Sequence, residues 1–574
     1  MKFYELSECF RKLEATTKRL DMFNILSETL AKIPKEDIAK AVYMLQETLL
    51  PPFFNVQLGV ADKMAERAIA EAYGTSLEKI EKMYKEKGDL GNIAEELNGE
   101  DKGSTLTISQ VYNKLMDIAQ TSGEGSVDKK VKLISDLLKE ASGLESKYIV
   151  RFMLGKLRLG VGEATIMEAL SMAKLHNRDF KAELERAFNL CSNLGKVAEV
   201  FYRDGEKGVR DFKIETMEPI RPALAERLPS AEEIIKKLGK CAVDQKFDGF
   251  RAQVHKDGDK VKVYSRNLED ITSYMPEITE AVRKLKIKKI IFDSEALTYD
   301  DETNTLYPFQ ITIQRKRKHN VEEVSQNFPL RLFVFDIMLL DDAQLINEPY
   351  SKRREALERI FQKEGTISKS SIIITDNPKE FDKFFEITVG NGLEGVVAKK
   401  LDAPYAAGAR NFNWVKLKRS YKSRLDDTID TVILGYFKGK GLRAALGIGA
   451  LLVGVYDEKA DMFKTIAKVG SGFSEEQFKE LRKILDDEKV DKKPARVDSI
   501  LVPDVWVEPK YVIAIKADEI TKSPIHTCGA KDGVGYALRF PRAVTFIRTD
   551  KKAEDTNTVK EIEEMFEEQK RVKI

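Results

Sequence analysis

Hydrophobic residues recur at three- and four-residue intervals, between charged ones, along roughly the first 212 residues of the chain. Residues 61–73 (ADKMAERAIAEAY) and Lys130–Leu138 show this spacing clearly, and it is typical of helices that bury one face. Glycine-containing stretches at 123–126 and 205–208 interrupt the pattern. The helical spacing predicts an all-helical domain over residues 1–212.

A glycine-rich turn lies inside this helical region. In residues 151–162 (RFMLGKLRLGVG) one predicted helix ends on glycine, and Glu163–Leu170 begins another. The free backbone amides at the start of a helix attract anions, so an anion site is one interpretation. An ordinary glycine-capped turn is the other, and the local sequence alone favours it.

The pattern changes at Met217–Pro222, where two prolines precede alternating apolar and polar positions. Ala252–His255 and Val261–Tyr264 flank the turn residues Lys256–Asp259, which predicts a β-hairpin. A second domain, built on strands, therefore begins near residue 213.

A compact charged motif, Lys246-x-Asp248-Gly249-x-Arg251, lies just before this hairpin. Lysine supplies an amine nucleophile, Asp-Gly a tight turn, and arginine a cation that can hold phosphate. Strict strand alternation would place Lys246 and Arg251 on opposite faces, so Asp248-Gly249 must break the strand if both reach one ligand. The hairpin register folds Arg266 back near Gly249, and we expect Arg266 to approach Lys246. Alone the motif is a weak signal, because it also suits a charged surface hairpin.

Further apolar runs carry acids or a lysine at their ends, where strands meet loops and site residues commonly lie. They are residues 290–297, 330–338 and 394–399. Residues 352–361 predict a helix. A basic run, Arg315–His319, fits a solvated face better than a specific site, although it could contact a phosphate backbone.

Short strands separated by glycine turns dominate the last part of the chain. The predicted strands are residues 431–437, 449–456, 462–469, 511–517 and 543–547, with a helix at 474–485. This pattern suits a small Greek-key barrel such as an OB-fold. Residues 556–573 predict a terminal helix.

Composition narrows the class of protein. The length of 574 residues suggests three or four domains. Lys plus Arg (96) nearly balance Asp plus Glu (94), so the net charge of +2 gives no global sign of polyanion binding. Four widely separated cysteines argue against a zinc ribbon and a disulfide framework. Abundant Lys and Glu with few Cys and His is typical of thermophile proteins, although many mesophile proteins share it.

The sequence gives no membrane or secretion signal. Charges lie where a signal peptide would carry its apolar run, and the longest apolar stretch, Ala444–Tyr456, is too short and glycine-rich to span a bilayer. We therefore expect a soluble protein of the cytoplasm.

The middle of the chain resembles the nucleotidyltransferase core of ATP-dependent DNA ligases. The resemblance is carried in order by Lys246/Arg251, Ser265-Arg266-Asn267, Asp293/Glu295, Phe335, Glu394–Lys399 and Lys416/Lys418. The motif around Lys246 also occurs in RNA ligases and messenger-RNA capping enzymes, so the core alone leaves these open. The flanks are similar to the three-domain replicative ligases of archaea and eukaryotes at residues 151–162, 221–225, 469–473, 539–542 and 548–551.

This resemblance implies a multidomain α+β architecture. A helical DNA-binding domain would cover residues 1–212, a mixed α/β adenylation core residues 213–418, and an OB-fold β-barrel with a C-terminal helix residues 419–574. As implied activity, Lys246 takes AMP from ATP and passes it to the 5′-phosphate at a DNA nick, and the 3′-hydroxyl then displaces AMP. Such ligation serves replication, repair and recombination.

Two alternatives to the ligase hypothesis remain. An RNA-capping guanylyltransferase or RNA ligase is disfavoured because neither needs the large helical module. A non-catalytic nucleic-acid clamp would be expected to lack the nucleophile, so the presence of Lys246 counts against it.

The resemblance also implies roles for individual residues. Asp244 would bind the adenine amino group, Phe335 would stack on the base, and Arg410 and Lys416 would hold phosphate. Asp244 departs from the family, which usually has glutamate at this position.

Charged residues complete the implied site. Arg251, Arg266, Lys416 and Lys418 around Lys246 would disfavour its protonated form and neutralise charge on the transferred phosphoryl group. Glu295 and Glu394 suit Mg²⁺, which prefers one or two carboxylates plus waters and nucleotide phosphates. For Asp293 two roles remain equally open, a metal ligand or a strand-end carboxylate that accepts a backbone hydrogen bond.

As partners the resemblance implies nicked double-stranded DNA and a sliding clamp, although the sequence shows no clear clamp-binding peptide. It also implies a monomer.

Overall fold

The computed structural model describes residues 1–16, 18–99, 104–157, 159–300, 305–306, 315, 325, 328–363, 365–418, 428–439 and 447–571. The chain divides into two compact units. The first contains Met1–Leu228, Glu232–Phe381 and Val397–Lys416, and the second Pro229–Ala231, Asp382–Val396 and Leu417–Ile574.

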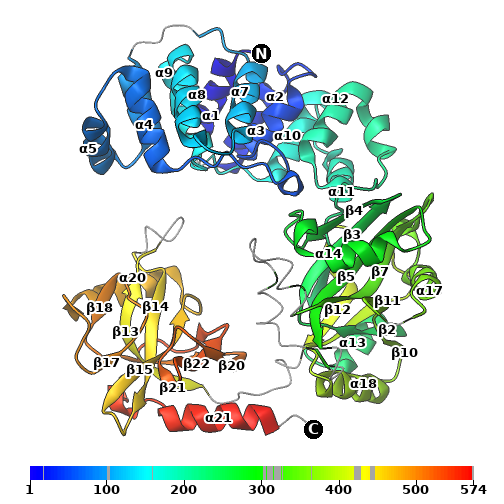
Figure 1. Ribbon diagram of the computed structural model, residues 1–574, viewed down its shortest axis with the longest axis vertical. Coiled ribbons are helices and arrows are strands. Elements are labelled where there is room, and N and C mark those ends of the chain that lie inside the picture. Colours follow the sequence, from blue (N-terminus) through cyan, green and yellow to red (C-terminus); the bar gives the residue numbers. More distant parts are fainter. Residues whose placement is uncertain are drawn as a thin grey trace. The chain divides into compact units, whose positions relative to one another are not determined.

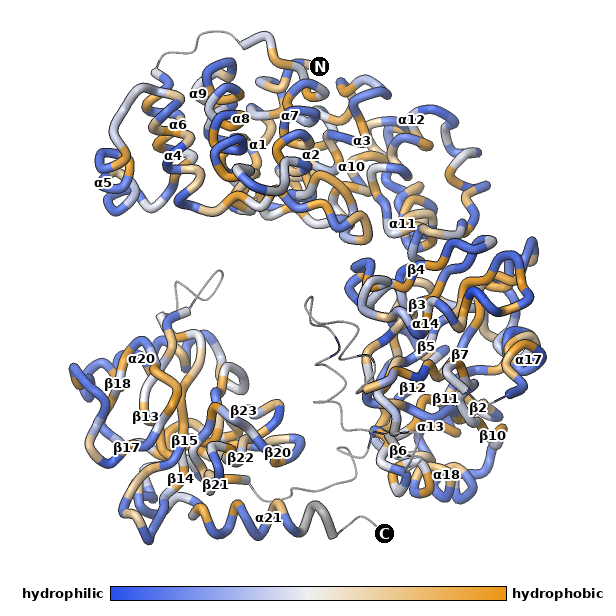
Figure 2. Tube along the Cα trace, in the orientation of Figure 1, coloured by the Kyte–Doolittle hydropathy of each residue, from blue (hydrophilic) through white to orange (hydrophobic). Residues whose placement is uncertain are grey.

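The first unit begins with helices throughout, as the periodic pattern predicted (Figure 1). Their bounds are α1 Phe3–Glu14, α2 Arg19–Leu30, α3 Ile38–Leu45, α4 Asp62–Tyr73, α5 Leu77–Lys87, α6 Leu90–Asn98, α7 Ile108–Gln120, α8 Ser126–Glu140, α9 Gly143–Met153, α10 Glu163–Leu175, α11 Lys181–Cys191 and α12 Leu194–Arg210. Hydrophobic and hydrophilic residues alternate along them (Figure 2). Their buried faces form one hydrophobic core that extends from Phe3 to Val209.

The predicted interruptions in the helices are confirmed. Residues 123–125 lie between α7 and α8, which begins at Ser126, and α10 begins at Glu163, as expected from the glycine-rich turn. Non-helical backbone at Gly205 interrupts α12. Arg158 of that turn lies outside the described residues.

Two sheets follow the helices. One runs in the order β1-β12-β11-β2-β10 and the other in the order β4-β3-β5-β7-β8, with β6 paired to β5 and β9 to β7. The strands are β1 Leu224–Arg227, β2 Cys241–Lys246, β3 Phe250–Asp257, β4 Lys260–Ser265, β5 Lys289–Asp300, β6 Thr305–Leu306, β7 Leu330–Leu340, β8 Ala343–Gln344, β9 Ile367–Lys369, β10 Ile372–Thr375, β11 Gly395–Lys400 and β12 Arg410–Lys418. Helices in this part are α13 Ala231–Leu238, α14 Pro276–Arg283, α17 Tyr350–Ile360 and α18 Pro378–Gly390. The predicted hairpin is confirmed, since β3 and β4 pair Ala252 with Ser265.

The segment that enters this core, residues 216–224, is held by side chains of β3. Gln253 accepts a hydrogen bond from the backbone N–H of Ile220 (2.7 Å) and donates to its carbonyl (3.0 Å). His255 Nδ1 accepts from the backbone N–H of Met217 (3.1 Å). Side chains at alternate positions of one strand thus bind the backbone of this entering segment.

The second unit is rich in short strands. They are β13 Ile429–Phe437, β14 Ala450–Asp457, β15 Met462–Val469, β16 Lys489–Val490, β17 Val497–Asp498, β18 Val505–Val507, β19 Val512–Lys516, β20 Glu519–Ser523, β21 Cys528–Lys531, β22 Val534–Arg539 and β23 Arg542–Ala543, with helices α20 Glu475–Asp486 and α21 Val559–Arg571. The sequence prediction missed β16–β18 and β20–β22. Its strand at 543–547 was too long, because β23 ends at Ala543 and Thr545 instead accepts the N–H of Ala514 through its side chain.

Two further observations bear on the predictions. The basic run Arg315–His319 lies outside the described residues except for Arg315, whose side chain is buried and paired with Glu277 at 2.5 Å. Arg315 is therefore part of the folded interior and not of a solvated face. Among the helices that the structure describes, none combines the length and apolar character needed to cross a membrane.

The buried imidazole of His255 predicts a pH effect on stability. Burial lowers its pKa from 6.5 to about 3, so the unfolded chain takes up a proton below pH 6.5 that the folded chain does not. The stability that depends on neutral His255 is complete above pH 6.5 and is lost as the pH falls towards 3. Between pH 6 and pH 4.5 the free energy of unfolding should fall by about 1.4 kcal/mol per pH unit more in the unsubstituted chain than in His255→Asn.

Asparagine keeps an acceptor for Met217 but does not titrate, so this variant isolates the imidazole. Hydrogen exchange of β3 amides in urea, followed at each pH, measures the difference. Equal acid sensitivity of the two proteins would contradict the assignment.

Candidate active site

Lys246 is the last residue of β2, and the strand breaks there as the sequence predicted. The next strand, β3, begins at Phe250 and belongs to the other sheet. Gly249 lies between them against β5, where an added Cβ would come within 2.3 Å of the carbonyl oxygen of Ala296. A larger residue would push the chain away from β5, so Gly249 allows the crossing from one sheet to the other.

Arg251 follows the crossing and is almost entirely engaged with the protein. Its Nη1 donates to the carbonyl of Ala223 (2.9 Å), and its Nη2 donates to Asp293 (2.5 Å) and to the hydroxyl of Tyr405 (3.0 Å). Burial alone would lower the pKa of Arg251, but Asp293 and Tyr405 hold it above its ordinary value. Its Nε is buried without a hydrogen-bond partner among the described residues, so that atom is a donor available to a ligand.

Asp293 does not fit the strand-end role left open by the sequence, and its role as a metal ligand stays a prediction. It lies in the interior of β5, not at its end, and its side chain is fully buried. One carboxylate oxygen accepts from Arg251 and Tyr405, and the other from Gln253 (3.2 Å). Because side-chain donors occupy both oxygens, Asp293 acts as the acceptor that orients Arg251.

Arg251 has two further neighbours among the predicted site residues. Glu295 of β5 stands directly opposite it in the antiparallel pair, so the two side chains share a face. Arg266 follows β4 and lines one small cavity with Arg251 and Pro222. The approach of Arg266 to Lys246 stays a prediction.

A second buried ion pair surrounds Asp244. Lys399 Nζ donates to Asp244 Oδ2 (2.7 Å) and to the carbonyl of Phe335 (2.8 Å). It also lies 4.7–4.9 Å from the ring centres of Phe335, Tyr350 and Trp414. Burial lowers the pKa of Lys399, and the nearby carboxylates of Asp244 and Asp336 oppose this shift.

The other oxygen of Asp244, Oδ1, is buried and has no hydrogen-bond partner in the described part of the chain. An unsatisfied buried acceptor is costly and marks a place for a donor. Phe335 is half-buried beside it and meets Trp414 edge-on, with ring centres 6.0 Å apart. Asp244 and Phe335, both predicted to contact a base, thus both accept a hydrogen bond from Lys399.

The remaining predicted residues lie on β12 and just before β11. Arg410 is exposed and donates to the carbonyl of Ala225 (3.3 Å), and Lys416 is half-buried further along β12. Glu394 and Lys418 form an ion pair. Gly395 follows Glu394 with φ 147°, and an added Cβ would lie 2.2 Å from the carbonyl oxygen of Leu417, so only glycine fits there.

Sequence reasoning missed three residues of this arrangement, namely Gln253, Lys399 and Tyr405. Lys399 ends the motif Glu394–Lys399, but nothing local marks it as the partner of Asp244. Among the residues described, no cluster of three or more His, Cys, Asp or Glu side chains is suited to hold a metal ion.

In the second unit, two cations of the last motif share one carboxylate. Lys551 Nζ and Arg548 Nη1 both contact Asp430, at 2.6 and 3.3 Å. Asp430 is largely buried, and these two cations compensate its negative charge. Arg542 of the neighbouring motif lies 3.9 Å from Asp518.

Comparison with known families matches all three parts of the chain. The family described as "ATP dependent DNA ligase domain" matches residues 222–418, "DNA ligase N terminus" residues 2–171, and "ATP dependent DNA ligase C terminal region" residues 444–551. The flanking matches favour a ligase over the capping-enzyme and clamp alternatives.

Relatives of known sequence agree over the full length. A probable DNA ligase of Dictyoglomus thermophilum is 51% identical and covers 100% of this chain and 99% of its own. A DNA ligase of Nitrosopumilus maritimus is 40% identical with the same coverage. The solved structure "Pmar-Lig_PreS3" shares the fold at a TM-score of 0.57 and 20% identity, covering 94% of this chain and 99% of that one. The chain belongs to the family of ATP-dependent DNA ligases.

Proposed function

We propose that the chain seals nicks in duplex DNA through a lysyl-AMP at Lys246 and an adenylated DNA end. One observation carries this proposal. Asp244 and Lys246 lie two residues apart on β2, and alternate residues of a strand point to the same face. The unsatisfied acceptor suited to an adenine amino group and the amine nucleophile therefore lie along one face of one strand.

In the first step the neutral amine of Lys246 attacks the α-phosphorus of ATP. A nitrogen–phosphorus bond forms, the bond to pyrophosphate breaks, and the amine proton is released. The 5′-phosphate of a nick then displaces the lysine, and the 3′-hydroxyl displaces AMP to give a phosphodiester. Arg251 through its Nε, Arg266, Arg410, Lys416 and Lys418 would neutralise phosphate charge during these transfers.

Magnesium fits the carboxylates that the sequence offers. Mg²⁺ needs one or two protein carboxylates when phosphates and waters supply its other oxygens, so a cluster of three acids is not required. Glu295 and Glu394 would hold it, and Glu394 would exchange its lysine partner for the ion. When bound, the ion would polarise the phosphoryl oxygens and favour departure of pyrophosphate.

The helical core that ends at Val209 supports a domain boundary near residue 212, with an adenylation core over 213–418 and a barrel domain over 419–574. Such an enzyme would act as a monomer inside the cell, in DNA replication, repair and recombination. A sliding clamp is a further proposed partner, and the species name of the relative from Dictyoglomus thermophilum supports a thermophilic source.

The nucleophile is tested by Lys246→Ala and Lys246→Arg. Neither side chain offers a neutral amine, so labelled ATP should leave no acid-labile, base-stable adduct, and overall ligation should stop. Pre-adenylated nicked DNA should still be sealed in part. A normal covalent adduct in either variant would show that another residue is the nucleophile.

The base contact is tested by Asp244→Asn. The amide has one acceptor, so either adenine or Lys399 must face an NH₂ group, and the KM for ATP in adduct formation should rise about tenfold to a hundredfold. Asp244→Glu keeps a carboxylate and should stay within a few-fold of the unsubstituted chain. An unchanged KM in Asp244→Asn would remove Asp244 from the base site.

The last motifs are tested by Lys551→Met and Arg542→Gln. We propose that these cations act only in the reaction with ATP, which requires the barrel domain to move about the linker after Lys418. Adduct formation should slow about a hundredfold, while sealing of pre-adenylated nicks stays nearly intact. Lys560→Met, an exposed charge on α21, is the matched control. A variant that forms adduct normally but fails to seal pre-adenylated nicks would contradict this division.

A further inference from the structure

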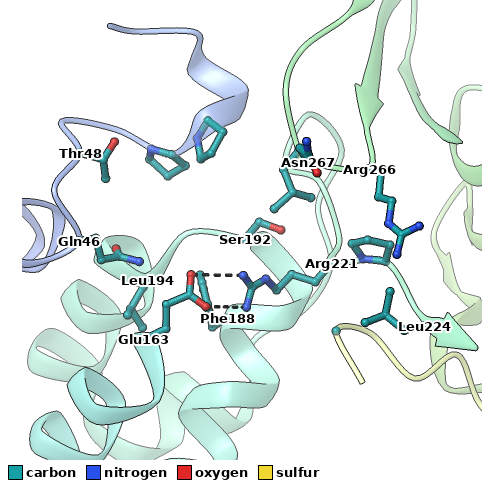
Figure 3. A pocket seen from close by; sticks show the side chains of 15 residues that line it. Gln46, Thr48, Glu163, Phe188, Ser192, Leu194, Arg221, Leu224, Arg266 and Asn267 are labelled. Atoms are coloured by element: carbon teal, nitrogen blue, oxygen red, sulfur yellow. Dashed lines mark hydrogen bonds and ion pairs between the residues drawn. The ribbon is translucent and has the colours of Figure 1, made fainter. Parts of the chain in front are cut away.

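A cavity of about 550 Å³ lies between the helical part of the first unit and the segment that enters the core (Figure 3). Glu163 of α10, Phe188 of α11 and Ser192 contribute one wall, and Arg221 and Arg266 the other. The close-up shows Arg221 extending across it towards Glu163. Arg266 has a role in the function proposed above, but Arg221 and Glu163 have none.

Two hydrogen bonds anchor the backbone of Arg221. Its backbone N–H donates to the carbonyl of Asn189 (2.8 Å), and its carbonyl accepts from the N–H of Gly408 (3.1 Å). The guanidinium lies over the ring of Phe188, 4.4 Å from its centre. The backbone and the ring thus fix the direction of the guanidinium whether or not an acid faces it.

The guanidinium of Arg221 forms an ion pair in which another anion can replace the carboxylate. It contacts both oxygens of Glu163, at 2.8 and 3.2 Å, the same two-point geometry with which arginine binds phosphate. The side chains of Arg221 and Glu163 are 30% and 39% exposed, so water screens the pair and it contributes little to stability. Glu163 is the first residue of α10, where the helix dipole stabilises its negative charge even without Arg221.

A second cation faces the same space. Arg266 lines the cavity and is exposed, and within the described residues its side chain makes no hydrogen bond or ion pair. Two guanidinium groups beside one carboxylate that can be exchanged suit a phosphodiester, which carries one negative charge on two oxygens, as a carboxylate does, and whose binding releases counterions.

We propose that Arg221 binds a backbone phosphate of the DNA substrate and that Glu163 occupies this phosphate position in the DNA-free chain. The inference rests on the proposed function for the identity of the ligand. DNA would displace Glu163, which returns to solvent at the start of α10, while Arg221 keeps its place on Phe188. Glu163 is therefore a competitor of DNA within the chain, and removing its charge should strengthen DNA binding.

The test measures the affinity of the full chain for a nicked duplex with a 3′-dideoxy end, by fluorescence anisotropy at fixed salt. Glu163→Gln should bind about three- to fivefold more tightly than the unsubstituted chain, because DNA no longer has to break the ion pair. The matched control is Glu168→Gln on the same helix, which removes the same charge from ion pairs with Arg19 (3.5 Å) and Arg178 (3.4 Å). It should change the affinity less than twofold.

Arg221→Gln completes the design. It should weaken binding, and the double variant with Glu163→Gln should bind no more tightly than Arg221→Gln alone, since the competitor matters only while Arg221 is present. Melting temperatures of the four variants and of the unsubstituted chain check that folding is retained.

Weaker binding by Glu163→Gln would show that the pair is a permanent clamp between helices and core and would overturn the inference. Equal tightening by Glu163→Gln and Glu168→Gln would reduce the effect to net charge and would overturn it as well. Adduct formation from ATP by the unsubstituted chain tests the proposed function separately. A normal adduct with no tightening therefore rejects this inference alone.

Discussion

The arrangement around Lys246 depends on the buried ion pair between Arg251 and Asp293. Asp293 has no contact with solvent, and removing one partner of such a pair costs about 3–5 kcal/mol because the other charge stays buried. Arg251 belongs to β3, Asp293 to β5, and Tyr405 precedes β12 in the other sheet. Through Arg251 and Tyr405 the pair also binds both backbone groups of Ala223. One polar cluster therefore fixes the strand register, the joining of the sheets and the path of the entering segment.

Other buried charges of the core are also paired, close to Asp244. Arg353 and Asp336 are fully buried and bind through two hydrogen bonds of 2.7 and 3.1 Å. Lys399 and Asp244 form the neighbouring pair. Well-packed apolar side chains in such places are often equally stable or more so, so stability alone does not account for these charges. Lys399 in particular orients Asp244 so that its second oxygen is left for a ligand.

The sequence predicted those features that local pattern determines. The helices up to Arg210, the break after Lys246 and the β3-β4 hairpin follow from periodicity and turn residues. Lys399 and Tyr405 became apparent only in the structure, because their partners lie 155 and 112 residues away along the chain. Strands such as β16, β17 and β23 have two residues each, too few for an alternating pattern, and their existence depends on neighbours that the sequence does not reveal.

Exposure separates the charge pairs that hold the fold from those that a substrate can replace. The side chains of Lys399 and Asp244 are 2% and 1% exposed, so no ligand can take either partner without leaving a bare charge in the interior. Arg221 and Glu163 are each exposed by about a third, and water can solvate whichever partner is released. Lys551 is exposed to about the same extent as Arg221, but its partner Asp430 is nearly buried. A protein that binds and then releases polyanions needs cations in partly exposed ion pairs such as Arg221–Glu163. Cations clustered without acids would repel one another, and a buried ion pair would not release its cation to a ligand. Acidic partners such as Glu163 compensate the charge of these cations until phosphate arrives.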